Sequence, residues 1–384
     1  MDFDLPAEDD PRRLEIRAWL ASNPRPAARE LRDAGYVVPH WPEPWGLDAT
    51  IEHRHIIEEE LRTADIDLPD NPIGIGWAGP TILAGGTDEQ RRRFLPPLLS
   101  GEEYWCQLFS EPGAGSDLAG LSTRALRDGD EYVINGQKIW TTWAHRADWG
   151  ILLARTDPAA PKHKGISYFL IDMRSPGIEI RPIVEMTGHA YFNEVFFADV
   201  RLPLANRIGS EGEGWAYANI TLGNERVSLS AGGVLWGMGP TTNEFIDKVR
   251  TEGGIADPVL RQRAADVYVQ GRIIDLLGYR IITKIQQGQG AATVAAIKKY
   301  IADRHGQELM NLAADLRGPD AMLGIDDEDS DVRDVWHWGF LFSRALTIGG
   351  GTTEVLRNII GERILGLPKE PPPVLHDVTA GGRR

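Results

Sequence analysis

The chain has 384 residues, which is enough for two or three domains with a large core. Its hydrophobic fraction of 42% and charged fraction of 25% are ordinary for a globular protein. The net charge of −15 argues against binding to nucleic acid or to an anionic membrane surface, but it does not exclude a local basic pocket for a phosphorylated ligand.

The cysteine count and the N-terminal sequence indicate in which cellular compartment the protein is found. The one cysteine, Cys106, excludes an internal disulfide framework and fits a reducing environment. The acidic start, Met1-Asp2-Phe3-Asp4, lacks the basic region and apolar core of a signal peptide. No run of about 18 apolar residues exists, so no membrane span is expected. We therefore expect a cytoplasmic protein.

Residues 1–103 are predicted to form a helical domain. Amphipathic patterns cover 11–20 and 51–61. The sequence Thr87-Asp88-Glu89-Gln90 is a capping box that marks the start of a further helix. These stretches are interpreted as packing elements rather than as parts of a site.

Residues 104–210 are predicted to form a central β-barrel domain. Short strand-like runs at 121–126, 131–134 and 137–140 are separated by Asp128-Gly129 and Asn135-Gly136, two dipeptides that favour hairpin turns. Four more runs follow, at 150–155, 166–173, 178–183 and 193–200. A compact barrel or sandwich fits this pattern, and we take it as a barrel.

Residues 211–368 are predicted to form a C-terminal four-helix bundle. Asp257 and Pro258 are an N-cap and a first-turn proline. Two long apolar stripes follow, and short connections between such helices favour an antiparallel bundle. Residues 369–384 are expected to be a loose tail. The fold class is thus α+β multidomain, with helical, barrel and bundle domains in that order.

Two segments of the central domain indicate a binding site for a large polar ligand. The loop Gln107-Leu108-Phe109-Ser110-Glu111-Pro112-Gly113-Ala114-Gly115-Ser116-Asp117 can bring bare amides and hydroxyls against a large polar ligand. About twenty residues later comes Gln137-Lys138-Ile139-Trp140-Thr141-Thr142. In order and spacing, the pair resembles the flavin-binding signature of the acyl-CoA dehydrogenase family. The resemblance extends over nearly the whole chain and includes 193–203 and 351–360.

The resemblance implies FAD-dependent α,β-dehydrogenation of an acyl-CoA thioester to the trans-2-enoyl-CoA. In that chemistry a carboxylate removes the α proton, and hydrogen bonds stabilise the developing enolate. By the resemblance, the residues that bind the cofactor are Gln107, Phe109, Ser110, Gly115, Ser116, Trp140, Thr142, Thr352 and Glu354. Ser116, Arg226 and Gly351 are carried over as substrate contacts. The glycines 349–351 also expose backbone amides at a helix N-terminus, which suits phosphate oxygens.

The chain departs from the family at the position of the base. Many members carry the catalytic glutamate where this chain has Gly350, which cannot accept a proton. Other members place it on the first bundle helix, in a Glu-Arg pair, and this chain has Glu225-Arg226 there. The resemblance therefore assigns the catalytic base to Glu225.

Several alternatives stay open. A flavin monooxygenase or oxidase on the same fold would need no such base, and a non-catalytic subunit of a heteromeric dehydrogenase is a third interpretation. The resemblance implies an electron-transfer flavoprotein as the electron acceptor. It also implies a homodimer or homotetramer, with a heteromer as an alternative.

The segment 249–258 lacks the Arg and Phe-Gly residues that in many relatives touch the flavin of a neighbouring subunit. The acyl group (short, branched, long or sterol side chain, in fatty acid or sterol degradation) is not specified. The histidines show no metal-ligand spacing, so no metal is expected.

Overall fold

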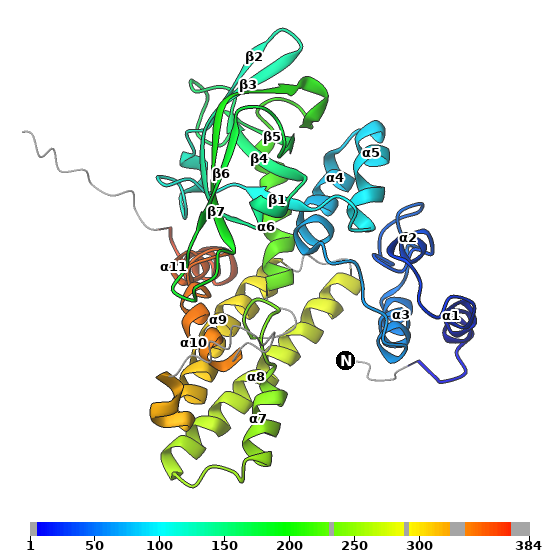
Figure 1. Ribbon diagram of the computed structural model, residues 1–384, viewed down its shortest axis with the longest axis vertical. Helices are drawn as coiled ribbons and strands as arrows, with labels where there is room; N and C mark the ends of the chain where they lie inside the picture. The colour runs from blue at the N-terminus through cyan, green and yellow to red at the C-terminus, as the bar shows by residue number, and fades with distance from the viewer. Residues whose placement is uncertain (1–5, 230–233, 288–291, 323–334, 370–384) are drawn as a thin grey trace, which may run out of the picture.

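The computed structural model describes residues 6–229, 234–287, 292–322 and 335–369, with a sheet between two groups of helices (Figure 1). The N-terminal helices are α1 (Pro11–Ser22), α2 (Ala28–Asp33), α3 (Ile51–Thr63), α4 (Gly79–Gly85) and α5 (Asp88–Leu99), with a π-helical turn at Gly74–Ala78. The predicted capping box opens α5. The Thr87 hydroxyl accepts from the Gln90 amide at 3.2 Å, and the Gln90 side chain accepts from the Thr87 amide at 2.8 Å.

The central domain is one open sheet. Its strands are β1 (Trp105–Leu108), β2 (Arg124–Asp128), β3 (Glu131–Thr142), β4 (Trp149–Arg155), β5 (Ile166–Asp172), β6 (Ile178–Ile183), β7 (Phe192–Pro203) and β8 (Arg207–Ile208). Their order is β6-β7-β3-β2-β4-β5-β8, and β1 pairs parallel to β4. The predicted β-barrel is therefore wrong. Closure would need β6 to pair with β8, but in the described chain β6 pairs with β7 and the two-residue β8 with β5.

One of the two predicted hairpin turns is also wrong. Asp128-Gly129 does connect β2 to β3. Asn135-Gly136 instead lies inside β3, where the pairing with β7 shifts register. The Asn135 side chain exchanges two hydrogen bonds with Asp199 of β7, at 2.9 and 3.0 Å. These long-range bonds hold the dipeptide as a β-bulge, and a Cβ at Gly136 would lie 2.4 Å from the Thr123 hydroxyl.

The C-terminal part is helical, as predicted. It contains α6 (Gly214–Leu229), α7 (Thr242–Thr251), α8 (Pro258–Gln286), α9 (Ala292–Arg317), α10 (Val335–Phe342) and α11 (Thr353–Ile359). The long helices α8 and α9 pack on each other, α6, α10 and α11 pack on α9, and α7 packs on α8. The Asp257 carboxylate accepts from the Val259 amide at 2.7 Å, so α8 begins at the predicted cap. Residues 370–384 of the predicted tail lie outside the described residues.

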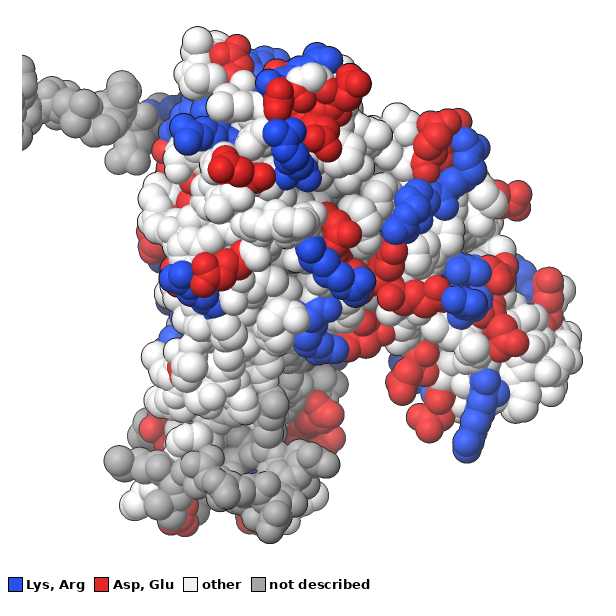
Figure 2. All heavy atoms as spheres, turned by 45° about the horizontal axis from the view of Figure 1, so that its top comes forward, with Lys and Arg blue, Asp and Glu red and all other residues white. Residues whose placement is uncertain are grey.

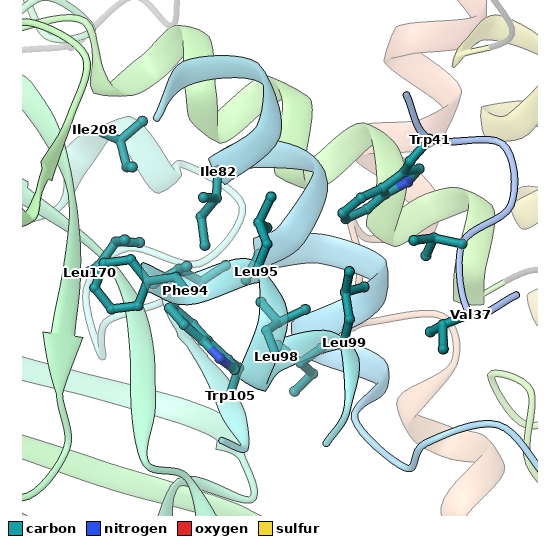
Figure 3. Packing of buried hydrophobic residues seen from close by; sticks show 14 of the residues in the cluster. Val37, Trp41, Ile82, Phe94, Leu95, Leu98, Leu99, Trp105, Leu170 and Ile208 are labelled. Carbon is teal, nitrogen blue, oxygen red and sulfur yellow. The ribbon is translucent and has the colours of Figure 1, made fainter. Parts of the chain in front are cut away.

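The largest hydrophobic core joins the N-terminal helices to one face of the sheet (Figure 3). Phe94 of α5 meets Trp105 of β1 edge to face, with ring centroids 5.8 Å apart, and Leu95 and Leu170 are fully buried in the same cluster. The N-terminal helices therefore cover this face of the sheet. The packing also fixes β1, whose end leads directly into the predicted flavin loop.

The surface is mixed in charge. Figure 2 shows acidic and basic side chains interspersed over the sheet and the N-terminal helices, and few charged side chains on this face of the C-terminal helices. Among the described helices, none combines the length and the apolar character that crossing a membrane requires.

Candidate functional site

The loop after β1 is fixed from beneath by a buried ion pair. The Lys138 ammonium, fully buried, donates to Glu111 Oε1 at 2.8 Å and to the Phe109 carbonyl at 2.9 Å. Glu111 also accepts from the backbone amides of Ser122 and Thr123. Burial would raise the pKa of the Glu111 carboxyl, but Lys138 and these amides together lower it to about 2. The loop conformation therefore depends on this pair, for which the sequence alone gives no signal.

The end of β3 presents an aromatic side chain to solvent. Trp140 has φ of +61° and lies where the pairing of β3 with β7 shifts register between Lys138 and Thr141. Its side chain is 57% exposed. A left-handed conformation is costly for a bulky residue and persists only where the surrounding structure enforces it. The bulge thus directs a large flat surface outward, beside the half-buried Thr142.

The structure brings the two predicted flavin segments together. The Ile139 amide of β3 donates to the Ser110 carbonyl at 2.9 Å. Ser116 is exposed, and a Cβ added at Gly115 would meet no heavy atom within 4 Å. Phe109 differs from the others, because its side chain is buried in the core against Tyr168. Its carbonyl already accepts from Lys138, so the predicted contact of Phe109 with the cofactor is not supported by its position.

Glu225 lies on α6 directly beside this loop. Its side chain is 6% exposed, and its Oε2 accepts from Gln107 Nε2 at 3.0 Å. Burial raises the pKa of the Glu225 carboxyl, against the opposing effects of the Gln107 hydrogen bond and the charges of Arg226 and Lys299. A buried carboxylate with a raised pKa and few partners is suited to accept a proton.

Gly350 faces the same carboxylate. A Cβ at Gly350 would lie 3.3 Å from Glu225 Oε1 and 2.6 Å from Leu229 Cδ1. Its φ of +64° also disfavours any other residue. The two positions that the family resemblance offers for the base, Gly350 and Glu225, therefore lie side by side in the fold.

A second buried lysine holds the glycine segment. Lys299 of α9 is fully buried, and its Nζ donates to Asp303 Oδ2 at 2.6 Å and to the Gly349 carbonyl at 3.0 Å. It therefore fixes the turn that passes Glu225. The sequence offered only a Lys-Asp pair four residues apart on a helix, which is usually a surface feature, so it gave no signal for this role.

The remaining predicted residues lie on α6 and at the start of α11. Arg226 is half buried, burial lowers its pKa, and its Nε has no hydrogen-bond partner in the described part of the chain. Thr352 caps α11 by accepting from the Val355 amide at 3.2 Å. Thr352 and the exposed Glu354 line an open groove that also contains Arg304 and Arg357.

These features fit a large, planar, anionic cofactor such as FAD. Gln107 Oε1 is buried and unpartnered within the described residues, and the ring of Trp140 is exposed to solvent. Gly113 and Gly115 leave open space, and Arg226 offers positive charge. Within the described segments, no cluster of three or more His, Cys, Asp or Glu side chains could hold a metal ion.

Comparison with known families agrees with this geometry. The family models for the N-terminal, middle and C-terminal domains of acyl-CoA dehydrogenases match residues 7–102, 106–200 and 212–365. Together they span most of the chain.

The chain is also similar to individual acyl-CoA dehydrogenases. The chain is 42% identical to acyl-CoA dehydrogenase FadE34 of Mycobacterium tuberculosis over 88% of its length, but spans only 46% of that protein. It is 40% identical to acyl-CoA dehydrogenase IpdE1 of the same organism, covering 93% of this chain and 89% of that one. Among solved structures, the Tcur3481-Tcur3483 steroid ACAD is similar with a TM-score of 0.79 and 28% identity, covering 96% of this chain and all of that one.

Proposed function

Because this chain belongs to the acyl-CoA dehydrogenase family, we propose that it is an FAD-dependent enzyme that oxidises an acyl-CoA thioester to the trans-2-enoyl-CoA, with Glu225 as the base. One observation carries the assignment. The Glu225 carboxylate is buried, faces Gly350, and is held by Gln107 of the flavin loop.

The reaction requires removal of a weakly acidic α proton. Glu225 accepts that proton, and burial favours the transfer because the neutral carboxylic acid is better tolerated there than the anion. Gln107 donates to Oε2 and so directs the carboxylate toward the loop. When bound, FAD supplies the two-electron oxidation of the Cα–Cβ bond.

The other residues hold the reactants. The residues proposed to bind FAD are Gln107, Ser110, Gly115, Ser116, Trp140, Thr142, Thr352 and Glu354. Phe109 is left out, because its side chain lies in the core and its carbonyl is bound by Lys138. Arg226 supplies a positive charge to a phosphate or to the CoA arm. Gly351, which has no side chain, exposes its backbone to the substrate. Lys299 positions the glycine segment from below through the Gly349 carbonyl.

The substrate and partners are inferred from the relatives. The similarity to a steroid ACAD supports a steroid-derived acyl group, and the two-part name of that protein, Tcur3481-Tcur3483, supports a heteromer as an alternative assembly. An electron-transfer flavoprotein is proposed as the acceptor. The direct test is anaerobic titration of the holoprotein with a panel of acyl-CoA thioesters while the flavin absorbance is followed. Bleaching by at least one thioester is expected. Rapid reoxidation by oxygen with peroxide release would instead indicate an oxidase.

The first prediction concerns the cofactor. The purified protein should be yellow with non-covalent FAD, and Gly115→Phe should strip the flavin, because the new ring would fill the open space beside the loop. Absorbance at the flavin band measures occupancy, and circular dichroism should show an unchanged helical content. Protein that stays colourless after incubation with FAD would refute the assignment.

The second prediction concerns assembly. One face of α8 exposes a row of large apolar side chains: Tyr268, Val269, Ile273, Leu276, Tyr279 and Ile282. Such a surface favours contact with another subunit. Light scattering at micromolar concentration should give a dimer or tetramer, and Ile273→Glu with Leu276→Glu should yield monomers. Leu14→Glu, at an apolar position on α1 that is at least as exposed, is the matched control. A monomeric wild type, without a second chain, would contradict the proposal.

A further inference from the structure

Helix α6, which carries the proposed base, is joined to the N-terminal helices by two hydrogen bonds between side chains. Helix α4 and the π-helical turn Gly74–Ala78 pack on α6 (Figure 1). Trp77 Nε1 of that turn donates to Ser228 Oγ at 2.7 Å. Thr81 and Thr221, both fully buried, share a hydrogen bond of 2.8 Å between their hydroxyl oxygens. None of these four side chains takes part in the proposed proton transfer or in holding FAD.

The two bonds lie on either side of the base along the helix. Thr221 is four residues before Glu225, and Ser228 is three residues after it. Residues at these spacings share one face of a helix. Helix α6 ends at Leu229, so Glu225 and Ser228 lie close to its C-terminus, where backbone carbonyls lose their intrahelical partners and helices fray. The bond to Ser228 therefore restrains the part of α6 that is intrinsically least stable.

Ser228 connects Trp77 to the backbone of the base. Its hydroxyl donates to the Glu225 carbonyl at 2.9 Å while it accepts from Trp77 Nε1. A serine hydroxyl has one donor and two acceptor lone pairs, so it can make both bonds at once. An indole N–H can only donate, which fixes the direction of the chain from Trp77 through Ser228 to Glu225. The N-terminal domain thus reaches the base through two consecutive hydrogen bonds.

Trp77 is itself held in place. Thr81 Oγ1 donates to the Trp77 carbonyl at 3.0 Å, and the next residue, Ala78, is fully buried. Single π-helical turns within helices occur frequently at functional sites. Here the turn sets the indole against the end of α6 while the ring stays half buried. The donor to Ser228 therefore comes from a fixed element rather than from a loose surface side chain.

A shift of the end of α6 would act directly on the carboxylate. The Glu225 side chain is buried, its Oε2 accepts from Gln107, and Gly350 lies on another side of it. A backbone displacement would therefore pull the carboxylate from Gln107. We propose that Trp77 is a positioning residue for the dehydrogenation, which acts through Ser228 to hold the Glu225 carboxylate at the distance that proton transfer requires. This inference rests on the proposed function, because it takes Glu225 as the base.

Trp77→Phe tests the proposal, because it keeps an aromatic ring but removes the N–H donor. In the FAD-loaded variant, the limiting rate of flavin reduction by acyl-CoA should fall about 5- to 50-fold, since small displacements of a reacting group are costly. The thioester concentration at half the limiting rate should change by less than about 2-fold, because the acyl-CoA contacts stay in place. Trp19→Phe is the matched control, at another half-buried tryptophan of the N-terminal domain, and should leave both values unchanged.

The pH dependence distinguishes positioning from a general loss of stability. The hydrogen bond from Gln107 opposes the raised pKa of the Glu225 carboxyl. If the end of α6 moves and this bond weakens, the pKa rises further. The pH at which the rate falls should therefore move upward in Trp77→Phe and stay in place in Trp19→Phe. A merely destabilised enzyme would lose activity without this shift.

Variants of Ser228 assign the effect to the hydrogen-bonded chain. Ser228→Ala should lower the rate as Trp77→Phe does, and Ser228→Thr, which keeps the hydroxyl, should retain the wild-type rate. The double variant Trp77→Phe with Ser228→Ala should be no slower than Ser228→Ala alone, because both changes break the same chain. Wild-type rates in both single variants, additive losses, or a slower rate with an unshifted pH profile would overturn the inference. Failure of the proposed function would appear differently, as no flavin bleaching in the wild type with any thioester.

Discussion

Glu225→Gln should lower the rate of flavin reduction by acyl-CoA at least ~10²-fold, the lower end for loss of a general base. The amide keeps the size of the side chain and can still accept from Gln107, so FAD and acyl-CoA binding should persist. Anaerobic rapid mixing measures the rate, and the flavin spectrum before mixing measures occupancy. Glu15→Gln is the matched control, because it removes an exposed carboxylate on α1, outside the proposed site.

The pH dependence follows from the burial of the same group. Glu225 accepts a proton only when ionised, and its pKa is raised by burial. The rate should therefore be full at alkaline pH and should fall as the pH drops through that raised value, above the pKa of about 4.3 for an exposed glutamate. In Glu225→Gln this step in the profile should vanish. A wild-type rate in the variant, with every active substrate, would place the base elsewhere.

Lys138→Met should destabilise the protein and release FAD. Removing one partner of a buried ion pair leaves an uncompensated charge, at a cost of about 3–5 kcal/mol. Here the orphaned group would be Glu111, and the Phe109 carbonyl would lose its donor as well. Denaturant unfolding measures the free energy, and flavin fluorescence after filtration measures release. The double variant Lys138→Met with Glu111→Gln should recover part of the stability, since no buried charge remains.

The loss of folding stability at acid pH provides a second test of the Lys138–Glu111 pair. Glu111 has a folded-state pKa of about 2, against an ordinary value of 4.5. A lowered carboxyl pKa contributes stability that is present above the unfolded-state value and is lost as the pH falls toward the folded-state value. This contribution should therefore disappear between about pH 4.5 and pH 2 in the wild type. Unchanged stability and FAD content in Lys138→Met would show that the loop does not depend on the pair.

Local signals in the sequence predicted local structure well. The Thr87 capping box, the Asp257 cap and the Asp128-Gly129 turn depend on residues within a few positions of one another, and each occurs as predicted. The order of helical, strand and helical regions was also predicted, both from periodicity and from the family resemblance.

The errors and omissions depend on contacts distant in sequence. Asn135-Gly136 forms a bulge because of Asp199, 64 residues away, and the open sheet follows from which edges pair. Phe109 belongs to a predicted cofactor loop, yet its side chain packs on Tyr168. Lys138 and Lys299 gave no signal, because a lysine is ordinarily exposed and nothing nearby indicates burial. Gly350 and Glu225 were linked by the family pattern, but only the fold shows that they meet.

Proton removal can be separated from oxidation, and this gives the most direct test of Glu225. In a 3-thia-acyl-CoA, sulfur replaces the β carbon, so the α proton can be abstracted but no β hydrogen can leave. The FAD-loaded protein is incubated in D₂O with this thioester, and loss of the α-proton signal is followed by NMR. The wild type should exchange the α proton, and Glu225→Gln, with its FAD retained, should not. Exchange at the wild-type rate in Glu225→Gln would contradict the assignment of the base.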